Sequence, residues 1–274
     1  MKIAAFQITS SKIIPFQTQA STLDEMTREL PQGFYTTFNT LSQGTKVLGL
    51  HAHLQRLYFP AMEQGIDPSV DEPTLRIRIA EFGALYLPRE SRLRLILIKE
   101  SGRIYIGTQP FEPPSKSVYA AGVKVITSES IRESPRVKDT GFISSSVAQR
   151  KLVGRDVFEV LLTKEGQIFE GMTSNFYAIK GRALVTAQKG ILLGVTRRVV
   201  LRLARGQGMS IEYRAPHINE IFDEAFITSS SRGVVPVIFI NEIPVGEGKV
   251  GRWAKTLSRA YQAYVEKRSE KIIK

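Results

Sequence analysis

Cysteine is entirely absent from the 274-residue sequence. This absence excludes disulfides and thiolate metal sites, and it fits a reducing cytoplasm. Long hydrophobic runs are also missing, since no apolar stretch approaches the ~20 residues of a membrane-spanning helix. The first residues, "MKIAAFQITSSK", lack the apolar core of a signal peptide. We therefore expect a cytoplasmic protein without a membrane partner.

Negative charge is scarce, because 26 acidic residues face 38 basic ones and the formal net charge is +12. Such an excess suits nucleic acids, anionic lipids or anionic small molecules. The basic residues are spread along the chain, and the densest patch, "KTLSRAYQAYVEKRSEKIIK", includes Glu266 and Glu270. That mixture is typical of a solvated helix surface. No nucleic-acid motif accompanies the charge, so no nucleic-acid partner is expected.

Composition is otherwise that of a globular protein, with 42% hydrophobic and 23% charged residues. The segment "PFEPPSKS" (110–117) holds three prolines and is the best linker candidate. It predicts an N-terminal α+β domain over 1–112 and a C-terminal α/β domain over 113–274. Strands and helices mix without strict alternation, which favours a two-domain α+β fold over a Rossmann sheet.

Several elements can be predicted by residue range. "GFYTTFNTL" (33–41) is rich in aromatic and β-branched residues and predicts a strand. Residues 91–109 predict a hairpin that turns at Ser101-Gly102. Residues 156–187 predict three strands, with turns at Glu165-Gly166 and Gly181-Arg182. Residues 194–208 predict an amphipathic helix closed by glycine.

Glu170 interrupts the strand-like run "QIFEGMTSNFYAIKG" (167–181). A buried carboxylate needs a partner, because an unpaired buried charge is unfavourable. A protonated heteroaromatic nitrogen would keep such an acid ionised. The alternative is a glutamate at a turn, facing solvent.

Three further features have a structural and a functional interpretation. Gly194 and Thr196 stand at the start of the helix over 194–208, where free N–H groups attract an anion, although Thr196 also suits an ordinary cap. The serine run 229–231 follows a β-rich segment and is either a phosphate-binding loop or a polar loop. Lys138, in "PRVKDTGF", is either a surface lysine or an amine that reacts with carbonyls.

Taken together, a lysine, an acid, a helix N-terminus and a hydroxyl loop are the parts that pyridoxal phosphate requires. The sequence also resembles a known family, the class IV (fold type IV) pyridoxal-phosphate enzymes. This family includes branched-chain aminotransferases, D-amino acid aminotransferases and aminodeoxychorismate lyases. The resemblance runs from about Gly33 to about Leu257 and is strongest in "HAHLQRL", "VKDTGF", "FEGMTSNFYAIKG", "ILLGVTR" and "DEAFITSSSRGVVPV". The interval of 32 residues from Lys138 to Glu170 also resembles that of the family.

The resemblance implies a role for individual residues. Lys138 resembles the catalytic lysine that bonds covalently to pyridoxal 5'-phosphate, and Glu170 resembles the acid at the pyridine nitrogen. The remaining cofactor-binding positions implied in this way are Arg56, Leu192, Val195, Thr196 and Ser230. The substrate side is matched by Tyr35, Thr37 and Ser231. The resemblance also implies a homodimer, with the cofactor site between the two domains and no metal.

The expected activity is transfer of an amino group between an amino acid, of branched-chain or D-amino acid type, and a 2-oxo acid. Thr36 and Thr37 follow Tyr35 where many family members carry an acid, which weakly favours an aminodeoxychorismate lyase that releases pyruvate to form 4-aminobenzoate. A non-catalytic binding protein on the same fold is the third alternative. The presence of both Lys138 and Glu170 argues against it. Four basic residues are candidates for binding a substrate carboxylate: Arg92, Arg94, Lys99 and Arg232.

Overall fold

The computed structural model describes residues 3–154 and 156–272. Their contacts divide the chain into two compact units. Unit 1 contains the residues up to Glu112, the stretch Val137–Ser145 and the residues from Lys267 on. Unit 2 contains Pro113–Arg136 and Ser146–Glu266. The segment that carries Lys138 therefore belongs to unit 1, although unit 2 residues flank it on both sides in the sequence.

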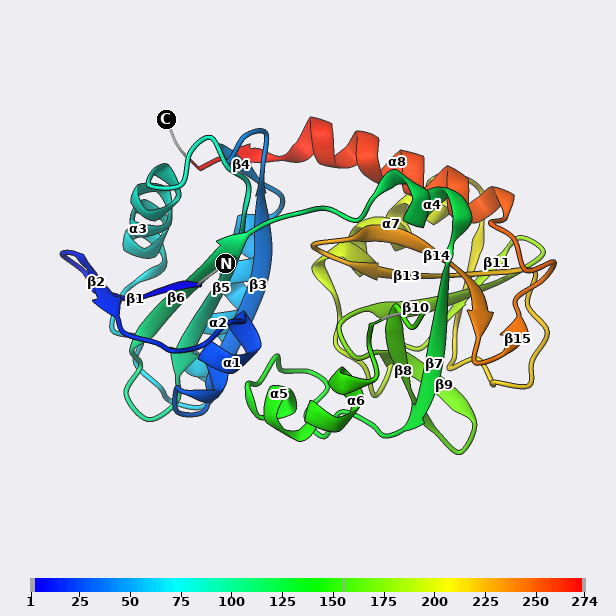
Figure 1. Ribbon diagram of the computed structural model, residues 1–274, viewed down its shortest axis with the longest axis horizontal. Helices are drawn as coiled ribbons and strands as arrows, with labels where there is room; N and C mark the ends of the chain where they lie inside the picture. Colours follow the sequence, from blue (N-terminus) through cyan, green and yellow to red (C-terminus); the bar gives the residue numbers. More distant parts are fainter. Residues whose placement is uncertain (1–2, 155, 273–274) are drawn as a thin grey trace. The chain divides into compact units, whose positions relative to one another are not determined.

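Unit 1 is built on an antiparallel sheet of seven strands, counted over the described residues (Figure 1). In sheet order the strands are β16 (Glu270–Lys271), β4 (Lys46–Val47), β3 (Gly33–Leu41), β5 (Ser91–Ile98), β6 (Ile104–Pro110), β1 (Ala4–Ile8) and β2 (Ile13–Phe16). Its helices are α1 (Leu23–Arg28), α2 (Leu50–Glu63), α3 (Glu72–Ala84) and α5 (Gly141–Ser145). The strand predicted over 33–41 and the hairpin of β5 and β6 are confirmed. Gly102 in the hairpin turn has a φ of +63°.

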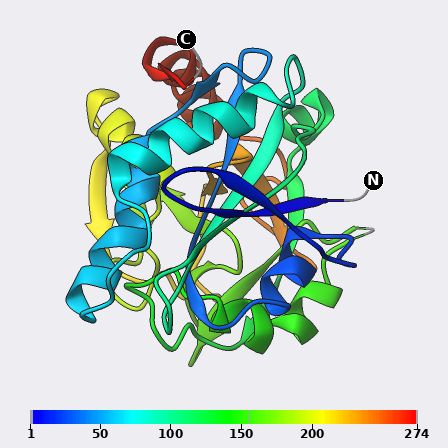
Figure 2. The same ribbon diagram turned by 90° about the vertical axis from the view of Figure 1, so that its left-hand side faces the viewer.

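Strand β3 is buried on both faces. Phe34 and Phe38 pack into one apolar cluster with Leu54 of α2. Tyr35, on the opposite face, packs into a second cluster that includes Met26 of α1. This alternation follows from the two-residue side-chain period of a strand. Figure 2 shows α2 and α3, in blue and cyan, on one side of the sheet.

Unit 2 holds the other nine strands of the described chain. They are β7 (Val123–Glu129), β8 (Glu159–Lys164), β9 (Gln167–Gly171), β10 (Asn175–Lys180), β11 (Ala183–Thr186), β12 (Ser210–Tyr213), β13 (Glu224–Ser229), β14 (Gly233–Ile240) and β15 (Ile243–Pro244). The helices are α4 (Lys116–Ala121), α6 (Val147–Lys151), α7 (Val195–Gly206) and α8, which runs from Arg252 to Arg268. Helix α7 confirms the helix predicted from Gly194 onward.

The sheet of unit 2 closes on itself. The path β10–β13–β14–β7–β8–β9 returns to β10 through the pair Glu170 and Asn175, which gives a barrel-like sheet. The prediction of three strands over 156–187 is wrong, because the structure has four. A tight turn at 172–174 divides the second predicted strand into β9 and β10, and Gly171 donates its N–H to the carbonyl of Ser174 at 2.8 Å. A Cβ at Gly171 would lie 2.1 Å from Ser174 Oγ, so glycine is required there.

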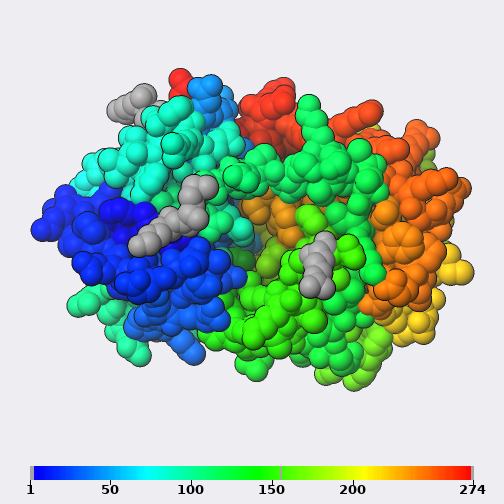
Figure 3. Space-filling model, viewed as in Figure 1, coloured from blue at the N-terminus to red at the C-terminus, as the bar shows by residue number. Residues whose placement is uncertain are grey.

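Both units combine sheets with helices, and the predicted α+β class is confirmed. Side chains fill the spaces between the ribbons, as the space-filling view shows (Figure 3). Over residues 3–154 and 156–272, no helix is both long enough and apolar enough to cross a bilayer.

Candidate functional site

The backbone of Lys138 is fixed against strand β3. Tyr35 donates its N–H to the carbonyl of Lys138 at 2.8 Å, and Thr140 donates its N–H to the carbonyl of Gly33 at 2.9 Å. Phe34 and Asp139 form the antiparallel bridge between these two bonds. The residue order "VKDTG" thus acts as a short extra strand, and Lys138 has a defined place at the edge of unit 1.

The side chain of Lys138 lies beside the aromatic residue predicted for the substrate side. Its Nζ is 4.6 Å from the centroid of the Tyr35 ring, a cation–π contact. Tyr35 is itself only 4% exposed, so its ring has a fixed position. The structure therefore brings Lys138 and Tyr35 together.

Arg56, predicted to bind phosphate, lies on α2 three residues after His53. His53 is 1% exposed, and its Nδ1 is 2.8 Å from the hydroxyl of Thr36 on β3. Burial lowers the pKa of His53 well below its usual value, and the charges of Arg56 and Lys138 lower it further. His53 is therefore neutral near pH 7. The sequence reasoning missed this residue, although the i, i+3 spacing within "HLQR" places it on the same helix face as Arg56.

Two of the basic residues considered for substrate carboxylate are committed inside unit 1. Arg94 is 5% exposed and pairs with Asp24 at 2.7 Å, while its Nε donates to the hydroxyl of Thr37 at 3.0 Å. Lys99 forms an ion pair with Asp139. Thr37, predicted to face substrate, thus accepts a hydrogen bond from a buried arginine.

Glu170 lies at the end of β9 and is 2% exposed, which excludes a solvent-facing side chain. Its Oε1 accepts from Nε of Arg132 at 2.9 Å. Its Oε2 accepts from the Leu192 N–H at 3.0 Å and from the Asn175 amide at 3.5 Å. These donors all stabilise the anionic carboxylate. Arg132 lies 38 residues earlier in the chain, so no local pattern revealed it.

Leu192 connects this carboxylate to the start of α7. Its N–H binds Glu170, its carbonyl accepts from Asn175 Nδ2 at 2.7 Å, and Gly194 follows as the N-cap of the helix. Gly194 offers no side-chain cap, and a Cβ there would lie 2.3 Å from Asn175 Oδ1. The first N–H groups of α7, including those of Val195 and Thr196, have no partner within the helix. A helix end of this kind attracts an anion.

The serine loop 229–231 joins β13 to β14. Ser230 and Ser231 are partly exposed in the turn. Arg232 holds the loop from behind, because its Nε donates to Ser229 Oγ at 3.1 Å and its Nη2 pairs with Glu159 at 2.7 Å. Glu159 is 1% exposed and also accepts from the hydroxyl of Thr173 at 2.6 Å. Arg232, the third basic candidate for substrate carboxylate, is thus paired with a buried acid that the sequence reasoning missed.

These residues fit the cofactor expected from the sequence. Unit 2 supplies a buried anionic carboxylate, an uncapped helix N-terminus and a hydroxyl loop, and the glycine at position 194 leaves room that a Cβ would fill. Unit 1 supplies an amine beside an aromatic ring, together with an arginine on α2. The individual roles remain predictions.

Comparison with known proteins gives consistent matches. The family model described as "Amino-transferase class IV" matches residues 33–240. A D-alanine aminotransferase of Bacillus licheniformis is 30% identical over 244 residues, which cover 82% of this chain and 85% of the relative. A "Probable branched-chain-amino-acid aminotransferase" of Thermotoga maritima is 30% identical over 250 residues, covering 87% of this chain and 88% of the relative.

Solved structures share the fold. A branched-chain amino acid aminotransferase from T.th., solved with pyridoxamine 5'-phosphate, superposes with a TM-score of 0.80 and 18% identity. The match covers 98% of both chains.

Proposed function

Since the chain belongs to the class IV aminotransferase family and is a pyridoxal-phosphate-dependent aminotransferase, we propose that Lys138, Glu170 and the start of α7 act on the same cofactor molecule. One observation carries this proposal. The segment 192–196 donates an N–H to buried Glu170 at one end and begins the uncapped helix α7 at the other. A ligand with a cationic ring nitrogen and a phosphate group matches both ends.

The proposed roles follow from the contacts. Glu170 stays anionic through Arg132 and the Leu192 N–H, and it holds a proton on the ring nitrogen of the cofactor. The N–H groups of Val195 and Thr196, the Thr196 hydroxyl and Ser230 bind phosphate, together with Arg56. When bound, the cofactor supplies a ring that accepts electrons from the α-carbon of the substrate. Lys138 Nζ takes the proton from that carbon and returns it to the cofactor side.

We propose that the amino donor has an apolar side chain. Arg94, Lys99 and Arg232 are each paired with an acidic side chain, so a second carboxylate on the substrate is not needed to balance their charge. The named relatives act on D-alanine and on branched-chain amino acids, and both classes are apolar. Tyr35 beside Lys138 gives this side chain an aromatic neighbour.

The test follows the absorbance of the purified protein with cofactor. We expect Lys138→Ala to abolish the band of lysine-bound cofactor, because the covalent bond cannot form. D-alanine or a branched-chain amino acid should convert the cofactor of the unchanged protein to its pyridoxamine form, and a 2-oxo acid should reverse this. An unchanged band in the variant removes Lys138 from the proposal. Pyruvate release from aminodeoxychorismate without an acceptor would instead assign the lyase reaction.

We also propose that the protein is a homodimer and acts in the cytoplasm. The family resemblance supports the first statement, and the lack of cysteine fits the second. Light scattering coupled to gel filtration tests the dimer, because the mass of one chain is 30.6 kDa and a dimer has twice that mass. Elution as a single chain at micromolar concentration would contradict it.

A further inference from the structure

We propose that Lys99 and Asp139 form a charge-neutral clamp that positions Lys138 and sets the pH at which its amine becomes reactive. This inference rests on the role proposed above for Lys138. Neither Lys99 nor Asp139 is assigned to bind cofactor or substrate. Both act through the segment that carries Lys138, so they are positioning residues.

The clamp begins in the backbone. Lys138, Asp139 and Thr140 pair with β3 as a short strand, in which successive side chains point to opposite faces. Lys138 Nζ lies over the ring of Tyr35, whereas Lys99 Nζ lies 5.1 Å from the ring centroid of Phe34. Phe34 and Tyr35 belong to different apolar clusters. Asp139 and Lys99 therefore lie on the face of β3 opposite to the Lys138 amine.

Lys99 is itself held in place. It directly follows β5, and its N–H donates to the carbonyl of Gln32 at 3.0 Å. Its ammonium pairs with Asp139 Oδ2, and the two side chains are 28% and 18% exposed. Partial burial makes this pair less screened than an ion pair in open solvent. The pair ties the Lys138 segment to the end of β5.

Asp139 fixes the segment on its other side as well. Its Oδ1 accepts the N–H of Gly141 at 2.7 Å, where α5 begins. Ile143 of α5 is 1% exposed and packs in the same cluster as Tyr35. The carboxylate next to Lys138 therefore connects both the end of β5 and the start of α5 to this segment.

The charges of the clamp also act on Lys138. Within unit 1, the groups that face its amine are Tyr35 of β3, Arg94 over the same ring, and Arg56 with neutral His53 on α2. Asp139 is adjacent to Lys138 in the chain, and Lys99 cancels its charge. Removing one member leaves a single charge near the amine, and the sign of that charge depends on which member is lost.

The experiment uses the full-length protein without added cofactor. Acetylation of Lys138 by acetic anhydride, quantified by mass spectrometry, gives the pH midpoint of its reactivity. Asp139→Asn keeps an acceptor for Gly141 but leaves Lys99 unbalanced, so the midpoint should fall by about half a pH unit. Lys99→Gln leaves Asp139 unbalanced, so the midpoint should rise by about the same amount. The double variant should return the midpoint to that of the unchanged protein.

A matched control is the ion pair of Lys124 and Glu242 in unit 2. Lys124→Gln and Glu242→Gln should leave the midpoint unchanged. The opposite shifts are the decisive result, because a purely structural role would alter both single variants in the same direction. Shifts of the same sign, or no shift in variants that keep the unfolding temperature of the unchanged protein, would overturn the clamp. A coloured Lys138→Ala protein would refute the proposed function while leaving this titration pattern intact.

Discussion

At the scale of single residues, the buried acid at position 170 illustrates what a sequence can and cannot reveal. Its place in an otherwise apolar run indicated that the carboxylate needs a partner, and the structure confirms the burial. The partner Arg132 could not be identified, because a contact across 38 residues depends on how β9 and the preceding loop fold together. Asn175 was more accessible, since a hairpin turn at 172–174 places it opposite Glu170.

His53 gives a prediction for the pH dependence of stability. Its pKa in the folded protein is depressed by burial and by the charges of Arg56 and Lys138, whereas an unfolded histidine has a pKa of about 6.5. The unfolded state therefore binds the proton more readily. The contribution of neutral His53 is fully present above pH ~6.5 and is lost as the pH falls toward the folded-state pKa, at up to about 1.4 kcal/mol per pH unit.

Urea unfolding at pH 7.5 and 5.5 measures this effect. The His53→Asn variant should lose less stability than the unchanged protein between these two pH values, because the titrating group is gone. His217→Gln removes an exposed histidine of unit 2 and serves as control. Equal losses in the unchanged protein and His53→Asn would contradict the assignment of a neutral, buried His53.

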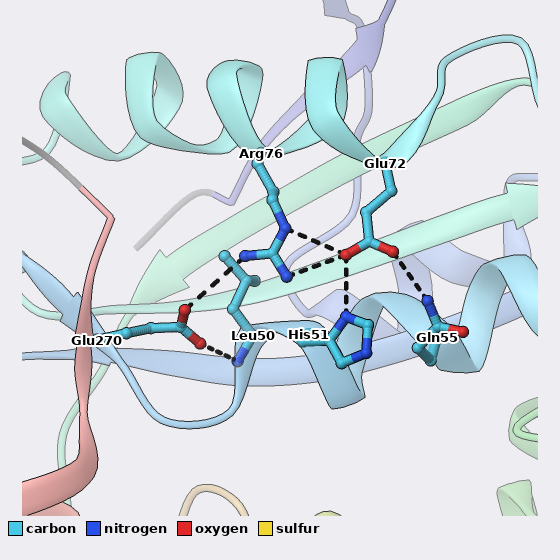
Figure 4. Close-up of polar contacts among 6 residues, drawn as sticks. All are labelled: Leu50, His51, Gln55, Glu72, Arg76 and Glu270. Atoms are coloured by element: carbon cyan, nitrogen blue, oxygen red, sulfur yellow. Dashed lines mark hydrogen bonds and ion pairs between the residues drawn. The ribbon is translucent and has the colours of Figure 1, made fainter.

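At the scale of elements, helix α2 begins without a cap from its own neighbourhood. Its N-cap is Gly49, with a φ of +66° and no side chain to accept a hydrogen bond. Glu270 of β16 supplies the acceptor instead, since its Oε1 receives the Leu50 N–H at 2.9 Å (Figure 4). The same figure shows Glu72 of α3 bonded to His51 and Gln55 of α2. The helix that carries Arg56 is thus anchored at its first turn by two other elements.

This arrangement predicts the effect of changing Glu270. Glu270→Ala should destabilise the protein by about 1 kcal/mol, because both an acceptor and a favourable charge leave the helix N-terminus. Glu270→Gln keeps an acceptor and should lose less. Hydrogen exchange of the amides at 50–53, with urea unfolding, measures both effects. Glu266→Ala, at an exposed position on α8, is the control. Unchanged exchange in Glu270→Ala would show that the cap contributes nothing.

Elements with strong periodicity were predicted well, and those defined by long-range pairing were not. The strand over 33–41, the hairpin of β5 and β6, and helix α7 follow local patterns of apolar residues and glycine. The separation of β9 from β10 was missed, because "MTSN" contains no glycine or proline to mark a turn. The capping of α2 by Glu270 spans 220 residues and has no local signal.

At the scale of the whole molecule, the net charge of +12 affects how an anionic cofactor arrives. A positively charged protein attracts a phosphate-bearing ligand over a range that salt shortens. We expect the association rate of pyridoxal phosphate to fall about tenfold between 20 and 300 mM NaCl in stopped-flow measurements. Pyridoxal, which lacks the phosphate, provides the comparison and should respond weakly. Equal salt dependence of the two compounds would exclude steering by net charge.

The division into units also has a consequence for how the protein is made. Unit 1 includes Val137–Ser145 and the residues from Lys267 on, whereas the residues between these two stretches belong to unit 2. A ribosome releases the chain in sequence order, so β3 and α2 emerge long before the strand that pairs with β4 and caps α2. During translation, the nascent unit 1 must wait for the complete synthesis of unit 2 before its sheet acquires its edge strand.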